Sequence, residues 1–258
     1  MLRKLKRIVK RVIRPVPKEL KITWVREGEG SWLRGWLGDQ SVAPPIDPRS
    51  RLIERLANAV DDLGPKRIWE RYADDLRGRW RQPDAVRTDR IMGNLFSALV
   101  VAKRPDVVVE FGTAFGVSGM YWLTGLEETQ HGTLYTFDPN EEWAQIARHN
   151  LERIGRRFVQ VVGTFEDHVD KTLPPNATID IAFIDAIHTS EFVEPQLDIV
   201  VAHARPGTII ICDDIDFSDD MRECWKRIAN STRFVTTAAI GSRVGIVELG
   251  GSSAAGMG

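Results

Sequence analysis

Five short apolar runs alternate with stretches of helical character between residues 107 and 212, and this alternation constrains the fold more than any other feature. Each run is almost continuously apolar, which is typical of parallel strands buried on both faces. The helical stretch that separates each run from the next predicts repeated βα units. We therefore expect an α/β fold with a doubly wound, mostly parallel sheet whose strands cover residues 107–111, 133–137, 158–162, 179–184 and 208–212.

Two further β-rich runs, 234–240 and 243–249, are separated only by Gly241 and Ser242. They predict a hairpin added at the sheet edge, which brings the sheet to seven strands. Upstream, residues 19–48 are rich in Gly, Pro and Trp and show no period, so we expect an irregular loop segment there. Residues 49–103 show three helical stripes, and we expect helices around residues 52–63, 68–76 and 91–102.

The first 18 residues carry eight basic side chains and no acidic one. Apolar residues recur among them at helical spacing, and Pro15 and Pro17 end the pattern. We interpret residues 1–18 as a basic amphipathic helix that rests on an anionic membrane surface. A basic arm or a helix docked on a partner subunit remains an alternative. Nucleic acid is not expected as a partner, because the net charge of the whole chain is -1 and the rest of the chain has no basic excess.

These patterns divide the chain into four parts: the amphipathic helix (1–18), a loop and helical extension (19–83), the main domain (84–249) and a Gly/Ser/Ala-rich tail expected to be disordered (250–258). The two cysteines, Cys212 and Cys224, form no Cys-x-x-Cys pair, which excludes a disulfide framework and a thiolate zinc site. No apolar run approaches the length of a membrane span, and no signal peptide is recognisable. We expect a cytoplasmic protein, peripheral on the membrane if residues 1–18 bind it.

A glycine-rich loop follows the first predicted strand of the main domain, in the sequence Glu-Phe-Gly-Thr-Ala-Phe-Gly-Val-Ser-Gly over residues 110–119. Gly112 and Gly116 allow a sharp turn and a close approach of the backbone to a ligand, and the following helix presents its N-terminal amides to an anion. The spacing is G-x-x-x-G-x-x-G, which differs from the G-x-G-x-x-G fingerprint of NAD-binding proteins. A tight βα turn without a ligand is the alternative.

Asp138 stands at the end of the second predicted strand, in Thr-Phe-Asp-Pro. An acidic residue at this place in a nucleotide-binding sheet can accept both hydroxyls of a ribose. Taken alone, Asp138 also fits a helix cap before Glu141 and Glu142. Together with the glycine loop, it predicts a nucleoside site.

Glu-Phe-Gly-Thr-Ala-Phe-Gly-Val-Ser followed by Thr-Phe-Asp resembles the class I methyltransferases, in particular the catechol O-methyltransferase-like branch, over about residues 88–249. The resemblance implies a Rossmann-like methyltransferase fold and S-adenosylmethionine (SAM) as cofactor. In the family the glycine loop holds the methionine part of SAM. The acid at the end of the second strand holds the ribose, and the segment after the third strand contacts the adenine. The implied cofactor-binding residues are Glu110, Gly112, Thr113, Gly116, Ser118, Asp138, Thr164 and Phe165.

Three carboxylates follow the fourth and fifth predicted strands: Asp185, Asp213 and Asp214. They emerge at the strand ends where such sheets bind ligands, and crowded carboxylates need a cation to offset their repulsion. Hard oxygen ligands favour Mg²⁺. The resemblance implies the same metal, since the family holds it on an aspartate after the fourth strand and an Asp-Asn pair after the fifth. Asp214 departs from that asparagine. A helix cap or pairing with nearby arginines is the alternative.

His188 lies three residues after Asp185, where catechol methyltransferases have a lysine base. An imidazole can accept a proton near pH 7, so we predict His188 and Asp185 as catalytic residues. A histidine that orients Asp185 or binds the substrate is the alternative.

We therefore expect a metal-assisted, SAM-dependent O-methyltransferase that acts on a hydroxyl of a vicinal diol or catechol, in a small molecule or a glycan. Two alternatives stay open: a metal-independent N- or O-methyltransferase, and a non-catalytic membrane-attached scaffold. The sequence is compatible with a homo-oligomer and does not identify the acceptor.

Overall fold

The structure is a computed structural model, and it describes residues 19–70 and 80–251. The predicted amphipathic helix of residues 1–18 lies outside these residues, as do residues 71–79 and 252–258, which hold the later part of the predicted helix 68–76 and most of the predicted disordered tail. Within the described ranges, no helix is long and apolar enough to cross a membrane.

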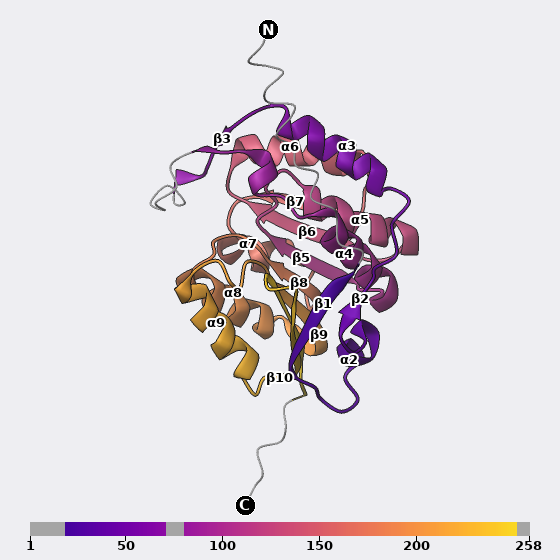
Figure 1. Cartoon of the computed structure of the whole chain (residues 1–258). Coiled ribbons are helices and arrows are strands. Elements are labelled where there is room, and N and C mark those ends of the chain that lie inside the picture. Colours follow the sequence, from indigo (N-terminus) through magenta and orange to yellow (C-terminus); the bar gives the residue numbers. More distant parts are fainter. Residues whose placement is uncertain (1–18, 71–79, 252–258) are drawn as a thin grey trace, which may run out of the picture.

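The described residues form one large twisted sheet and a separate two-stranded ribbon (Figure 1). Five adjacent strands of the large sheet run parallel and confirm the predicted βα units. In spatial order they are β9 (Ala204–Cys212), β8 (Ile179–Ile184), β5 (Val107–Phe111), β6 (Thr133–Asp138) and β7 (Phe158–Val162).

The other edge of this sheet corrects the sequence-based strand count. The predicted hairpin, β10 (Phe234–Ile240) and β11 (Val244–Leu249), is present, but it is not the edge of the sheet. β1 (Leu20–Arg26) pairs with β10, and β2 (Ser41–Val42) pairs with β1, so the sheet has nine strands among the described residues. The expectation of an irregular loop over 19–48 was therefore wrong. Leu20 and Ile22 alternate with exposed Lys21 and Thr23, a strand pattern that the Gly- and Trp-rich composition of the segment conceals.

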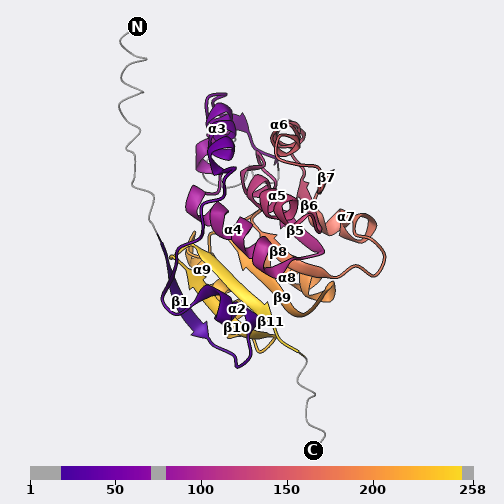
Figure 2. The same cartoon turned by 90° about the vertical axis from the view of Figure 1, so that its right-hand side faces the viewer.

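Helices cover both faces of the parallel strands (Figure 2). One face carries α4 (Arg90–Lys103), α5 (Val117–Thr129) and α6 (Glu141–Glu152), and the other carries α7 (Phe165–Thr172), α8 (Ser190–Ala202) and α9 (Asp219–Asn230). Side chains of β5 alternate between the two cores: Val108 belongs to the first, whereas Val107 and Val109 belong to the second. This burial on both faces explains the continuous apolar runs of the sequence.

The N-terminal extension shares the first core instead of forming a separate unit. It comprises β1, α2 (Trp32–Leu37), β2, α3 (Ser50–Asp61), the ribbon of β3 (Lys66–Arg67) and β4 (Trp80–Arg81), and a 3₁₀ turn (Pro83–Ala85). Leu33, Leu37 and Ile53 are buried in the same cluster as the inner residues of α4 and α5. α3 and α4 confirm the predicted helices 52–63 and 91–102.

The order of the parallel strands places a crevice at the centre of the sheet. The chain runs from β5 outward to β6 and β7, and then returns to β8 on the opposite side of β5. Connections after β5 and β8 therefore diverge to opposite faces, and ligands of such sheets bind outside the carboxyl ends of the strands at this point. The loops that begin at Gly112 and Asp185 stand at this position.

Candidate active site

The glycine loop turns directly under the loop that follows β8. Gly112 has φ +90°, and a Cβ on it would lie 2.1 Å from the backbone oxygen of Asp185. Its amide donates to the carbonyl of Phe137 at 2.9 Å, which fastens the loop to the end of β6. Only glycine fits here, because both the backbone conformation and the close approach exclude a side chain.

α5 begins at this loop without a side-chain cap. Its N-cap residue is Gly116, with φ +80°, and no side chain accepts a hydrogen bond from the first-turn amides. By contrast, Asp89 caps α4 and Asn140 caps α6 through their side chains. The first turn of an uncapped helix offers N–H donors and the positive end of the helix dipole to an anionic group.

Glu110 lies at the base of this loop, and Thr113 and Ser118, two further predicted cofactor residues, are part of it. Glu110 is fully buried and accepts a hydrogen bond from Thr136 at 2.7 Å, while Thr136 also contacts the hydroxyl of Thr113 at 2.5 Å. Burial raises the pKa of Glu110 to about 7, although hydrogen bonds from Ser118 and Thr136 oppose the shift. Two hollows, a larger and a smaller one, flank the loop. Glu110 supports the loop from below and lines neither of them, whereas Thr113 and Ser118 line the smaller one.

Asp138 joins the second strand to the glycine loop. One carboxylate oxygen accepts the amide of Ala114 and the other accepts the amide of Asn140, each at 2.8 Å. Burial raises the pKa of Asp138 to about 6, and these two amides reduce the shift. Asp138 is almost fully buried, and its neighbours Phe137 and Pro139, rather than Asp138 itself, line the larger hollow.

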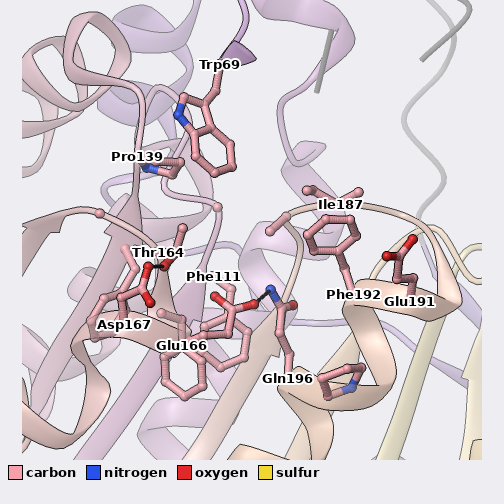
Figure 3. Close-up of a pocket in the computed structure, with 16 residues that line it drawn as sticks. Trp69, Phe111, Pro139, Thr164, Glu166, Asp167, Ile187, Glu191, Phe192 and Gln196 are labelled. Atoms are coloured by element: carbon pink, nitrogen blue, oxygen red, sulfur yellow. Dashed lines mark hydrogen bonds between the residues drawn. The ribbon is translucent and has the colours of Figure 1, made fainter. Parts of the chain in front are cut away.

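The larger hollow is a cavity of about 250 Å³ between the loops after β5, β6, β7 and β8. Figure 3 shows Trp69 and Pro139 at one end, Ile187 and Phe192 at another, and Glu166 hydrogen-bonded to Gln196 at 2.7 Å. Thr164 and Phe165, both predicted, are among the lining residues. Phe165 is only 2% exposed, because it packs on Phe111 and Phe137 at centroid distances of 3.8 and 5.4 Å.

A smaller hollow lies on the other side of Gly112. It is lined by the glycine loop, the first residues of α5, the segment Val86, Arg87 and Thr88, and Asp185. Gly112 lines both hollows. An apolar and aromatic hollow and a small hollow of about 10 Å³ next to an uncapped helix terminus therefore lie on either side of this glycine.

Asp185, Asp213 and Asp214 come together beyond the smaller hollow. The amide of Asp185 donates to Phe111 and that of Asp213 to Ile184, which aligns the ends of β8 and β9. Asp185 is partly buried, and burial together with the charge of Asp213 raises its pKa well above the ordinary value. Burial also raises the pKa of Asp214, while His188 opposes that shift.

Arg243 bridges two of these carboxylates, those of Asp213 and Asp214. Its Nη2 and Nε lie 2.6 and 2.9 Å from the two oxygens of Asp213, and Nε also lies 2.7 Å from Asp214 Oδ1. The bidentate pair with Asp213 has the fork geometry in which a guanidinium binds a carboxylate most strongly. Although burial opposes it, the charges of Asp213, Asp214 and Asp185 raise the pKa of Arg243.

His188 completes the cluster on the side of Asp214. Its Nε2 lies 3.3 Å from Asp214 Oδ2 and 3.8 Å from Asp185 Oδ1, and its ring lies against Phe217. The structure thus brings together all four residues that the sequence placed at the catalytic and metal site.

The carboxylates do not fit the predicted magnesium site. Both oxygens of Asp213 and one of Asp214 face Arg243, and the other oxygen of Asp214 faces His188. Across residues 19–70 and 80–251, no group of three or more acidic, His or Cys side chains is arranged to hold a metal ion. Pairing of Asp213 and Asp214 with an arginine, the alternative considered from the sequence, is what the structure contains.

Several residues of the site were not predicted. Arg243 was not predicted, because it lies in the hairpin turn and is far from the glycine loop in sequence. Trp69 comes from the N-terminal extension and Arg87 from the short segment that precedes α4, and the sequence showed no functional motif in either. Glu191, Phe192 and Gln196 lie on α8, and their apolar and polar mixture resembles an ordinary surface helix.

A doubly wound sheet with an antiparallel hairpin beside its parallel strands, and with a G-x-x-x-G loop at its topological switch point, is the arrangement of the class I methyltransferase fold. Residues 109–215 match a family model described as a methyltransferase domain. This confirms the resemblance predicted from the sequence.

Solved structures agree in fold. An O-methyltransferase from Bacillus cereus in complex with SAH has 21% identity and a TM-score of 0.56, covering 79% of this chain and 92% of its own. A Streptomyces achromogenes O-methyltransferase involved in tomaymycin synthesis, in complex with SAM, has 16% identity and a TM-score of 0.60, with coverage of 81% and 93%. A putative O-methyltransferase from Klebsiella pneumoniae has 18% identity and a TM-score of 0.58, with coverage of 80% and 91%.

Proposed function

We propose that the protein is a SAM-dependent O-methyltransferase that methylates a hydroxyl group of a small molecule or a glycan. One observation carries the proposal: the two hollows that meet at Gly112 end beside a histidine and a cluster of carboxylates. The two hollows suit an elongated nucleoside cofactor. The histidine and the carboxylates suit proton removal from an acceptor. SAM-bound and SAH-bound neighbours of the same fold support the choice of cofactor.

The residues present fit SAM. The apolar hollow with Phe165 and Trp69 suits an adenine, and the Glu166–Gln196 pair offers polar partners to its edge. The carboxylate of Asp138 accepts the amide of Ala114, which lines the smaller hollow, and suits the ribose hydroxyls. The uncapped first turn of α5 and Arg87 suit the methionine carboxylate. When bound, SAM supplies a methyl group on a positively charged sulfur.

His188 is the proposed general base. With Nε2 directed to Asp214, Nδ1 is the nitrogen that accepts the proton of the acceptor hydroxyl. The carboxylate of Asp214 then stabilises the imidazolium, as an orienting acid does in other His-dependent enzymes. The ionised acceptor oxygen would then take the methyl group that bound SAM supplies, and the electron pair of the broken carbon–sulfur bond would remain on the sulfur. Asp185, between the base and the glycine loop, is placed to hold a second acceptor hydroxyl. A vicinal diol or a catechol would supply both groups.

Magnesium assistance, which the family resemblance implies, is not part of this proposal, because Arg243 already neutralises the carboxylates that would bind the ion.

Calorimetry with S-adenosylhomocysteine tests the cofactor, and one molecule bound per chain is the expected result. Methyl transfer from labelled SAM is then measured with catechols and with glycans that carry vicinal hydroxyls. Matched acceptors in which those hydroxyls are already methylated serve as controls. Absence of cofactor binding would contradict the proposal and favour a scaffold that only retains the fold.

A further inference from the structure

We propose that Arg243 is a built-in cation that replaces a divalent metal at the acceptor end of this site. The proposal deepens the proposed function and depends on it for its catalytic consequence. It assigns to the chain itself the charge that three crowded carboxylates require, and it predicts that the intact protein does not bind a divalent ion there.

The first support is the geometry of the guanidinium. A metal ion shared by Asp213 and Asp214 would have to lie between their facing oxygens, and the Nε of Arg243 lies there, 2.9 Å from one carboxylate and 2.7 Å from the other. Nη2 takes the second oxygen of Asp213. A planar guanidinium can satisfy several carboxylate oxygens at once, which a lysine ammonium does less well.

The second support is the way the backbone holds Arg243. Its carbonyl oxygen accepts the amide of Ile215 at 2.9 Å, so the hairpin turn is attached to the loop that bears Asp213 and Asp214. The following residue, Val244, opens β11 and is buried. Backbone and side chain of Arg243 are thus both fixed to the β9–α9 loop, which favours a permanent partner over a surface side chain that meets the cluster by chance.

The third support is charge. Asp185, Asp213 and Asp214 are all largely removed from water. Arg243 supplies a permanent positive charge to Asp213 and Asp214, while the imidazole of His188 lies against Asp185 and Asp214. A divalent ion added to this set would be repelled by a guanidinium a few ångströms away. With Arg243 in place, the acidic cluster still orients His188 through Asp214. The side of the cluster that faces the smaller hollow then stays open to the acceptor.

The test measures Mn²⁺ binding, which needs no acceptor. The full-length protein is freed of metal with EDTA and titrated with Mn²⁺ while the electron paramagnetic resonance signal of the free ion is recorded. Arg243→Met removes the charge and keeps the length of the side chain. Arg205→Met is the matched control, because Arg205 also pairs a half-exposed guanidinium with a buried aspartate, Asp180 at 2.7 Å, at the start rather than the end of the strands.

We expect wild type and Arg205→Met to leave the free-ion signal unchanged. Arg243→Met should bind about one Mn²⁺ per chain, roughly a hundredfold tighter than wild type, which is the order of the repulsion between like charges a few ångströms apart in a protein. A further Asp213→Asn change in the Arg243→Met variant should abolish that binding. Arg243→Gln gives the same comparison if Arg243→Met does not fold, as judged by thermal unfolding.

Binding of one Mn²⁺ by wild type, lost in Asp213→Asn, would overturn the proposal, since the ion would then displace Arg243. Failure of a folded Arg243→Met to gain the ion would also overturn it. Once an acceptor is known, wild-type turnover should be the same in EDTA and in Mg²⁺. If no acceptor is ever methylated, the proposed function fails, while the Mn²⁺ comparison still decides the role of Arg243.

Discussion

Gly112 and Asp185 meet backbone to backbone at the switch point of the sheet: a Cβ on Gly112 would lie 2.1 Å from the carbonyl oxygen of Asp185. This contact sets the spacing between the loop assigned to the cofactor and the loop that carries the acid and the proposed base. A change at Gly112 should therefore disturb both functions at once.

A residue other than glycine in a left-handed backbone conformation costs roughly 1–2 kcal/mol. Gly112→Ala should lower the free energy of unfolding by more than this amount, and it should abolish cofactor binding. Urea unfolding and calorimetry with S-adenosylhomocysteine measure the two effects. Gly64→Ala is the control, because Gly64 has φ +76° but a methyl group added to it would meet nothing within 4 Å. Equal losses in the two variants would show that the contact with Asp185 has no special weight.

Asp138 should make cofactor affinity depend on pH. Its pKa is raised to about 6, and only the ionised carboxylate can accept both ribose hydroxyls while it holds Ala114. Affinity for S-adenosylhomocysteine should therefore be full above pH 7 and fall as the pH drops through about 6, by up to about tenfold per pH unit. Asp138→Asn should bind about 1–3 kcal/mol more weakly at pH 7 and lose this step.

Glu110→Gln is the control for that titration, because burial also raises the pKa of Glu110, to about 7. This variant should keep the step near pH 6. If the fall in affinity near pH 6 is absent from Glu110→Gln and present in Asp138→Asn, the acid assigned to the ribose has been misidentified.

His188→Ala should reduce turnover by about a hundredfold or more, which is the usual contribution of a general base. Its affinity for S-adenosylhomocysteine should not change, because His188 lines neither hollow. With a phenolic acceptor, activity should partly return at high pH, where the hydroxyl ionises unaided. His203→Ala, which breaks a surface pair with Asp170 at 2.9 Å, is the matched control and should retain full turnover. A fully active His188→Ala would exclude the proposed base.

Phe165 should contribute more to stability than a side chain that only stacks on a ligand. It packs on Phe111 and Phe137 beneath the larger hollow, so Phe165→Ala should cost about 3–5 kcal/mol of unfolding free energy. Val162→Ala, on the neighbouring strand and half-exposed, should cost no more than about 0.5 kcal/mol. Phe165→Leu should restore most of the stability. A loss of cofactor affinity in Phe165→Ala without a loss of stability would contradict this assignment.

Residues 1–18 should bind anionic membranes. Their eight cations flank an apolar stripe, so the full-length protein should sediment with phosphatidylserine vesicles at low salt and a chain without residues 2–18 should not. Neutral vesicles and high salt are the controls, since both remove the electrostatic attraction. Unchanged sedimentation of the shortened chain would place the membrane contact elsewhere.

The sequence predicted the parts of the fold whose signals are local. β5 and β8 are buried on both faces, so their apolar runs mark them directly, and an apolar stripe over residues 91–102 marks α4. β1 was missed because only its first four residues alternate cleanly and its partner, β10, lies far away in the sequence. Such pairing depends on the whole sheet and leaves little trace in the segment itself.

The site was predicted to the same extent. Asp185, His188, Asp213 and Asp214 follow buried strands, and strand order alone brings their side chains together. Arg243 could not be found in this way, since a cation in a hairpin turn resembles any solvent-facing residue until the turn is seen to attach to the β9–α9 loop. The magnesium site was predicted from three acidic residues, and the arginine that pairs with two of them, Arg243, was not considered.

The pairing of Ile22 with Ile240 has a consequence for how the chain folds during its synthesis. β1 leaves the ribosome long before the strand that it pairs with, and until then its polar backbone and its apolar side chains lack their native neighbours. Contacts of such large sequence separation slow folding and prolong the exposure of unpaired strands. We therefore expect the hairpin of β10 and β11 to complete the sheet last and to bring Arg243 to the acidic cluster in the same step, so that assembly of the sheet and neutralisation of the carboxylates coincide.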